Sequence, residues 1–190
     1  VQGLVNSFGT TVMAAFAAAV KIDTFAYLPV QDFGNAYSTF IAQNYGAGNT
    51  DRMHRGTKQA FAWSMAFCLM ISALVYVFAA PLMGLFVDSG ETAVIAAGVG
   101  YLRVEGAFYV GIGCLFLLYG FYRAIARAGM SVVLTVLSLG TRVALAYALS
   151  GVMGENGIWL SIPLGWALAD AVGLAAMKGA MKRLHQTEHL

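Results

Sequence analysis

The chain has 190 residues, of which 59% are hydrophobic and only 11% are charged, and its mean hydropathy is +0.72. Soluble domains carry about 25% charged residues, so this composition excludes a water-soluble globular domain and a soluble catalytic domain. The net charge of +2 is small, and we expect no nucleic-acid partner. Because one helix crosses a bilayer with about 20 apolar residues, the chain could form five or six spans with short loops.

Long stretches without charged residues mark the predicted spans. They are far longer than the roughly 10-residue strands of a membrane barrel and do not alternate strictly, so we predict helices. The predicted fold class is all-α, a polytopic transmembrane helical bundle. The chain starts at Val1 inside an apolar run, which favours a fragment of a longer chain. We expect one transmembrane domain over 1–190, with helices at approximately 1–9 (partial), 11–46, 52–80, 92–125, 128–150 and 156–184.

The first two apolar runs leave two interpretations open. Lys21 and Asp23 could form a loop between two spans. Alternatively, the chain breaks near Gly9 and one helix runs over 11–45 with a kink at Pro29. That helix would be about 50 Å long at 1.5 Å per residue, so it would have to bend or protrude from the bilayer.

Other charged residues interrupt the later runs. Arg103 and Glu105 are two residues apart, so they point to different sides of a helix, and we interpret them as interfacial, with Arg103 reaching outward. Arg142 and Asp170 lie on separate spans. We interpret both as structural pairing groups, although not necessarily with each other.

The charges of the connecting segments alternate in sign along the chain. Segments 46–58, 123–127 and 178–183 are basic, whereas 81–91 and 151–157 are acidic. Basic connections stay in the cytoplasm. We therefore predict a multi-pass protein of the plasma membrane with a cytoplasmic C-terminus.

Polar residues recur along one face of the predicted long helix at spacings i, i+3, i+7 and i+11. They are Asp32, Asn35, Thr39 and Gln43. Lys21 shares this face if the helix is continuous. Pro29 lies between Lys21 and Asp32 and removes one backbone hydrogen bond of the helix there. The face could line a substrate route, or it could join helices through hydrogen bonds. Asp32 could equally form a structural pair with Lys21.

The remaining patterns indicate packing rather than chemistry. Cys68 and Cys114 lie within apolar runs without metal or redox spacing. A ladder of small residues at i, i+4 spacing predicts close helix contact on the last span; it consists of Ser161, Gly165, Ala169 and Gly173. No nucleophile set, phosphate-binding loop or zinc spacing is present, so we expect no enzyme, no metal site and no ATP-driven mechanism.

Several segments in chain order resemble the carboxy-terminal lobe of multidrug and toxic compound extrusion (MATE) transporters. They are Asn6 to Asp23 with its Gly break, the proline-containing 28–36, the Gln-x-x-Gly-Ala segment 41–49, Tyr101 to Arg103, the Arg-containing 122–129, and the Gly-Ile-Trp segment 157–163. The chain is thus similar to one six-helix lobe of a MATE-type transporter with its first helix truncated. The resemblance also favours the break at Gly9.

The resemblance implies a secondary exporter of amphipathic or cationic organic compounds that alternates access between two lobes. The implied partners are small organic substrates, the lipid bilayer and the N-terminal lobe of the same protein. The coupling ion would be Na⁺ or H⁺, with no other cofactor. Alternatives are a flippase for lipid-linked oligosaccharides of the same superfamily, and a non-transporting membrane subunit or inactive fragment.

At the level of residues, the resemblance implies that Asp32, Asn35, Thr39 and Gln43 line the second-lobe cavity together with Lys21. Asn6 takes the place that a coupling Asp holds in the first lobe of some members, and it cannot exchange a proton. Other members carry an acid in the middle of the tenth helix, where Gly111 to Cys114 offers none. The coupling residue could therefore lie outside this chain.

Overall fold

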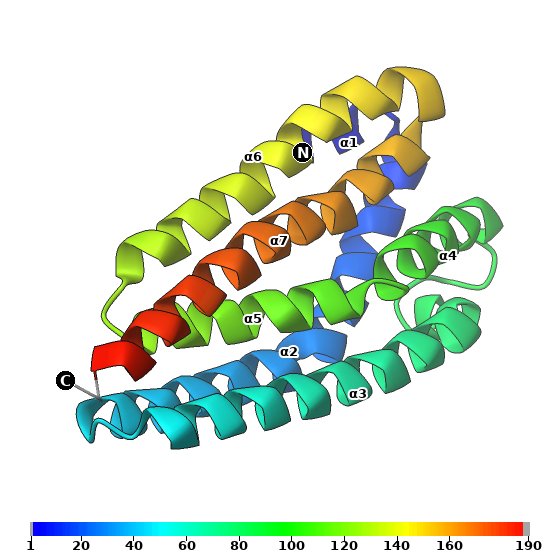
Figure 1. The fold of residues 1–190 in the computed structure, drawn as a ribbon. Helices are drawn as coiled ribbons and strands as arrows, with labels where there is room; N and C mark the ends of the chain where they lie inside the picture. Colours follow the sequence, from blue (N-terminus) through cyan, green and yellow to red (C-terminus); the bar gives the residue numbers. More distant parts are fainter. Residues whose placement is uncertain (1, 188–190) are drawn as a thin grey trace.

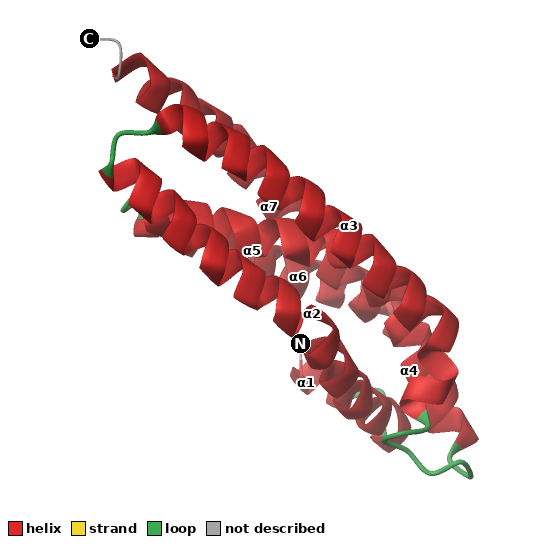
Figure 2. Cartoon of the chain, turned by 90° about the horizontal axis from the view of Figure 1, so that it is seen from below, coloured by secondary structure: helices red, strands yellow, loops and turns green. Residues whose placement is uncertain are grey.

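The computed structural model describes residues 2–187, and over that range the chain is helical without a strand. Its helices are α1 (Gln2–Asn6), α2 (Thr10–Gly46), α3 (Thr50–Met83), α4 (Thr92–Gly106), α5 (Tyr109–Ala124), α6 (Ala128–Met153) and α7 (Glu155–Thr187). Figure 1 shows an elongated bundle in which α2 lies beside α3 and α6 lies beside α7, with α5 between the two pairs. Figure 2 shows that the longer loops lie at the two ends of the bundle.

Four helices of the described chain, α2, α3, α6 and α7, are long and apolar enough to cross a membrane. The helices α4 and α5 pass the same test as a pair, and they are bent by 52° at a short break between them. The molecule is therefore a polytopic helical membrane protein, with four continuous spans and a fifth that is broken.

The helix α2 is continuous from Thr10 onward, because Lys21 and Asp23 lie within it and do not form a loop. It begins after Gly9, whose φ of 95° lies in the left-handed region that glycine adopts readily. Pro29 lies inside the helix, where it removes one backbone hydrogen bond. Figure 1 shows α2 changing direction between its dark-blue first half and its light-blue second half.

The expected single helix over 92–125 is instead two helices. α4 ends at Gly106, and α5 begins at Tyr109 after Ala107 and Phe108. The break falls about halfway along the combined span rather than at an end, and Ala107 and Phe108 are exposed. The intervening residues are apolar or small, and hydropathy alone could not distinguish them from a continuous helix.

Small residues allow α6 and α7 to approach closely along their length. A Cβ atom added to Gly165 would lie 2.5 Å from the Ser138 carbonyl oxygen of α6. One added to Gly173 would lie 2.6 Å from a methyl carbon of Leu118 on α5. Ser161 and Ala169 of the same ladder are fully buried. The ladder therefore serves the close helix contact predicted for it.

An aromatic cluster fills the core where α2, α4 and α7 meet. The ring of Trp159 stacks on Phe16, with centroids 5.6 Å apart, and meets Tyr101 edge-on at 4.9 Å. Phe16 and Tyr101 also meet edge-on at 5.5 Å. Such pairs add about 0.5–1.5 kcal/mol each beyond their buried area, so this cluster holds the three helices in a defined arrangement.

Candidate functional site

Two buried carboxyl groups meet beside the break between α4 and α5. Asp23 on α2 is 1% exposed, and Glu105 in the last turn of α4 is 4% exposed. The Tyr109 hydroxyl, from the first residue of α5, donates a hydrogen bond to the Asp23 carboxyl. Asp23 also interacts with the side chains of Tyr101 and Glu105. We call Asp23, Tyr101, Glu105 and Tyr109 the acidic cluster.

The helices place these side chains together by simple geometry. Tyr101, Glu105 and Tyr109 follow one another at i, i+4 and i+8, so they occupy one face of the broken span. Asp23 lies on the buried face of α2 that packs against this span. Four polar side chains from three helices consequently converge inside an apolar bundle.

Arg142 is a half-buried base on α6. Its charge acts favourably on both Asp23 and Glu105. The Nε atom of Arg142 is buried without a hydrogen-bond partner, as are one oxygen of Asp23 and one of Glu105. Charged groups at membrane depth are costly and lie mostly at ion paths and proton relays. The acidic cluster is therefore the candidate functional site of the described chain.

The chemistry of the acidic cluster suits a small monovalent cation. Carboxylate and hydroxyl oxygens can bind either H⁺ or a hard metal cation, and broken membrane helices commonly frame such sites in secondary transporters. Within residues 2–187, no group of three His, Cys, Asp or Glu side chains could hold a metal ion.

The residues that we expected to line a substrate route lie on an exposed face of α2, away from the acidic cluster. Asp32, Asn35, Thr39 and Gln43 are all exposed. The guanidinium of Arg123, at the end of α5, donates hydrogen bonds to Asn35 Oδ1 at 2.8 Å and to Ser38 Oγ at 3.4 Å. Pro29 is exposed as well, and so is Asn6 on α1. The shared face exists as predicted, and its role stays a prediction.

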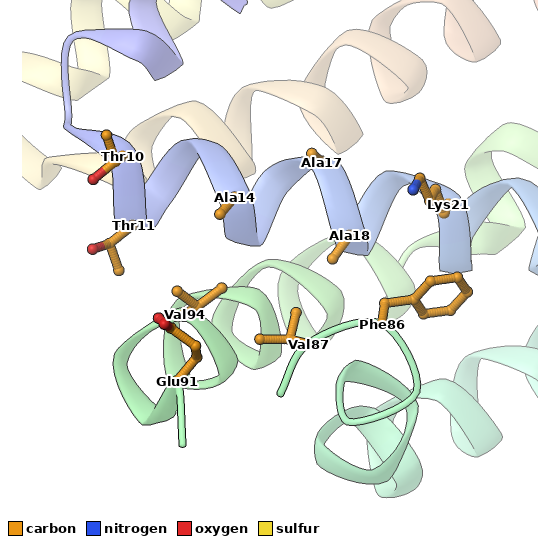
Figure 3. A pocket seen from close by; sticks show the side chains of 10 residues that line it. All are labelled: Thr10, Thr11, Ala14, Ala17, Ala18, Lys21, Phe86, Val87, Glu91 and Val94. Atoms are coloured by element: carbon orange, nitrogen blue, oxygen red, sulfur yellow. The ribbon is translucent and has the colours of Figure 1, made fainter. Parts of the chain in front are cut away.

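The structural pair of Asp32 with Lys21 is wrong. Eleven residues separate them on a continuous helix, which corresponds to about 16 Å at 1.5 Å per residue. Lys21 instead lines a cavity of about 510 Å³ between the first half of α2 and the segment that leads into α4. Figure 3 shows Lys21 and Glu91 toward opposite ends of this cavity, and the Lys21 Nζ lies 6.0 Å from the centre of the Phe86 ring.

The interfacial interpretation is wrong for Glu105. Arg103 is exposed and lies over the Tyr76 ring, 5.4 Å from its centre, whereas Glu105 points inward and is buried. We also expected no acid in the middle of this span, where Gly111 to Cys114 offers none. Glu105 lies in the last turn of α4, just before the break near the middle of the span. The i, i+4, i+8 spacing of Tyr101, Glu105 and Tyr109 was the sequence signal that could have revealed it.

A second buried acid lies apart from the acidic cluster. Asp170 on α7 is 9% exposed, interacts with the Cys114 thiol of α5, and has one unpartnered oxygen. Cys68 and Cys114 are both buried and free. The expectation that Arg142 and Asp170 are structural pairing groups stays a prediction.

The fold and these polar groups define a polytopic membrane protein with a polar site at a broken helix. The family model MatE matches residues 1–148, and the chain belongs to this family of membrane transporters. It is 29% identical over 171 residues to a probable multidrug resistance protein, YpnP of Bacillus subtilis, covering 90% of this chain and 38% of that protein. It is also 29% identical over 157 residues to an FAD transporter of Shewanella oneidensis, covering 80% of this chain and 33% of that protein.

Solved structures share the fold. The crystal structure of the Vibrio cholerae MATE transporter VcmN in the bent form superposes with a TM-score of 0.89 at 22% identity, covering 97% of this chain and 42% of that one. The chain therefore corresponds to one six-helix lobe whose first helix is short. It spans less than half the length of each of these proteins.

Proposed function

We propose that this chain is the C-terminal lobe of a secondary exporter in the plasma membrane that couples Na⁺ or H⁺ entry to the efflux of amphipathic, cationic organic compounds. The observation that carries the proposal is the acidic cluster, in which two carboxyl groups with unpartnered oxygens lie buried at a helix break. A coupling cation would bind there, and the partner lobe of the same protein would complete the substrate cavity.

The exposed polar face of α2 supports the substrate class. In a two-lobe transporter this face would turn toward the cavity, where Asp32 offers a negative charge to a cationic substrate. Asn35, Thr39 and Gln43 offer hydrogen-bonding groups along the same helix. Binding at this face and coupling at the acidic cluster are separate tasks, because the two sets lie on opposite sides of α2.

The experiment is dye efflux by the full-length protein in vesicles, under a sodium gradient and a proton gradient applied separately. We expect Asp23→Asn and Glu105→Gln to abolish the stimulation by the coupling gradient, and Asp32→Asn to weaken efflux of a cationic dye. Asp88→Asn, which changes an exposed acid in the loop before α4, is the matched control and should behave as wild type.

Two results would oppose the proposal. Undiminished gradient-driven efflux in both Asp23→Asn and Glu105→Gln would remove the acidic cluster from coupling. Because one relative is named an FAD transporter, efflux of a flavin nucleotide is measured beside that of the dye. Preference for the anionic flavin would contradict the cationic substrate class while leaving the coupling site intact.

A further inference from the structure

A pocket opens between the start of α3 and the end of α7. Its volume is about 530 Å³, and it is lined by Lys58 of α3 and by Lys178 and Lys182 of α7, among others. Figure 1 shows the cyan start of α3 and the red end of α7 at the same end of the bundle. We call the space between these three lysines the basic pocket.

Positive charge dominates the lining of the basic pocket. Lys178 and Lys182 are four residues apart on α7, so their side chains lie on one face of that helix. All three lysines are exposed, and exposed ammonium groups are charged at neutral pH. Asp51 is the one acid among the described residues that line the pocket, and His54 adds an imidazole. The bases outnumber the acid, so the pocket attracts an anion.

The deeper wall of the basic pocket is apolar. Met177 is 9% exposed and Met181 is half-buried, and both line the pocket one helical turn apart on α7. Thr57 of α3 is buried, and its hydroxyl shares a hydrogen bond of 2.8 Å with the Tyr37 hydroxyl of α2. This bond fixes the α3 side of the wall against the bundle. A charged rim over a methionine surface suits an amphiphilic anion better than a small inorganic one.

The position of the basic pocket along the bundle indicates which amphiphile is at hand. The pocket lies in the first turns of α3 and the last turns of α7, at the basic end that we predict to face the cytoplasm. Anionic phospholipids give the cytoplasmic leaflet its negative surface charge, and basic pockets between membrane helices at this level bind their head groups. The volume also falls within the range of about 300–1,000 Å³ that is typical of ligand pockets.

We propose that the basic pocket binds the head group of an anionic phospholipid of the inner leaflet. The lipid phosphate accepts hydrogen bonds from the ammonium groups of Lys58, Lys178 and Lys182, while Met177 and Met181 contact the glycerol and the first methylenes of the chains. The bound lipid joins α3 to the end of α7, two helices that otherwise meet over few residues. The inference does not involve the acidic cluster, which lies on α2, α4 and α5.

The test is thermal unfolding of the purified full-length protein in detergent with added phosphatidylglycerol or phosphatidylcholine. We expect the anionic lipid to raise the wild-type melting temperature more than the zwitterionic one, because a ligand of the folded state stabilises it. This excess should fall to about half or less in the triple variant Lys58→Gln, Lys178→Gln, Lys182→Gln.

Two control variants separate the basic pocket from net charge. The triple variant Arg52→Gln, Arg55→Gln, Arg127→Gln removes the same number of exposed charges at the same end of the bundle, outside the lining of the pocket, and should keep the wild-type excess. The variant Lys58→Arg, Lys178→Arg, Lys182→Arg keeps the charge and should keep the excess as well. Native mass spectrometry should show one phosphatidylglycerol fewer on the lysine-to-glutamine variant than on the arginine-to-glutamine one.

Three results would overturn the inference. An equal loss of the excess in both glutamine variants would mean that the lipid responds to net charge alone. An undiminished excess in the lysine-to-glutamine variant would mean that the lipid binds elsewhere. Equal stabilisation of wild type by inorganic phosphate, lost in that variant, would assign the pocket to a soluble phosphate compound. Efflux enters none of these measurements, so each result leaves the proposed function standing.

Discussion

The hydrogen bond from Tyr109 to Asp23 joins the two sides of the acidic cluster. Asp23 comes from α2, and Tyr109 is the first residue of α5, immediately after the break. A carboxyl group buried in an apolar bundle is costly unless donors satisfy it. The tyrosine hydroxyl therefore stabilises Asp23 in place and also holds the start of α5 against α2.

Removing this hydroxyl should weaken the fold measurably. Tyr109→Phe leaves Asp23 without its donor while keeping the ring, so we expect a loss of about 1–3 kcal/mol in unfolding free energy. Thermal unfolding of the purified full-length protein in detergent measures the change. The control is Tyr147→Phe, which alters an exposed tyrosine on α6 and should leave the melting temperature unchanged. Equal stability of the two variants would mean that the hydrogen bond contributes nothing.

The sequence indicated some of these side chains and missed others for a physical reason. The spacing of Asp32, Asn35, Thr39 and Gln43 predicted one shared face, because a continuous helix alone decides that. Whether Asp23 faces the core depends on the helices that pack around it, and this information is tertiary. The sequence therefore left Asp23 open between a loop and a position inside a continuous helix, and it did not predict the contact with Glu105.

At the scale of elements, the break in the fifth span and the contact of α6 with α7 position the polar groups. The break forms an exposed turn between Gly106 and Tyr109. Glu105 and Tyr109, which flank this turn, lie on the same side of the broken span. The close approach at Gly165 sets the backbone of Ser138 and Arg142 directly against α7. Both features depend on backbone geometry, so small changes in side-chain volume should disturb the site from a distance.

Gly165→Ala is the direct test of the helix contact. The added Cβ would lie 2.5 Å from the Ser138 carbonyl oxygen, so α6 must shift away from α7, at a cost of about 1–3 kcal/mol. Gly140→Ala on α6 is the matched control, because nothing lies within 4 Å of its added Cβ and alanine favours a helix. We expect a lower melting temperature for the first variant only. A melting temperature for Gly165→Ala at or above that of wild type would contradict the packing.

Hydropathy predicted the helical class and most of the long helices, since long apolar runs have few other structures in lipid. It could not predict the break at Ala107 and Phe108. These residues are apolar or small like their neighbours, and the 52° bend separates two helices that both pack against α2, α3 and α7. The start of α2 after Gly9 was indicated by the resemblance of this segment to the family. In the structure Gly9 has a positive φ, which suits glycine.

At the scale of the whole molecule, the exposed polar face of α2 and the charges of the connecting segments support the proposal that this chain is half of a transporter. The face carries Asp32 and its polar neighbours, which a second lobe would cover around a cavity. One end of the bundle is basic, with Arg52 and Arg55 in the first turns of α3 and Arg127 just before α6. The connection from α3 to α4 at the other end carries Asp88 and Glu91. We predict that the basic end faces the cytoplasm.

Thiol labelling of intact cells tests this orientation. The background lacks Cys68 and Cys114, and single cysteines replace Ser89 in the acidic loop or Arg127 in the basic one. A membrane-impermeant reagent should label Ser89→Cys in intact cells and Arg127→Cys only after permeabilisation. The reverse pattern would invert the topology and the direction of transport that we propose.

The central claim is that the buried acids Asp23 and Glu105 exchange a cation for substrate. Its most direct measurement is the release of Na⁺ or H⁺ when a cationic substrate is added to the purified full-length protein. We predict release from wild type and none from the double variant Asp23→Asn, Glu105→Gln, provided that the variant keeps the wild-type melting temperature. Equal release from the folded double variant would contradict the account.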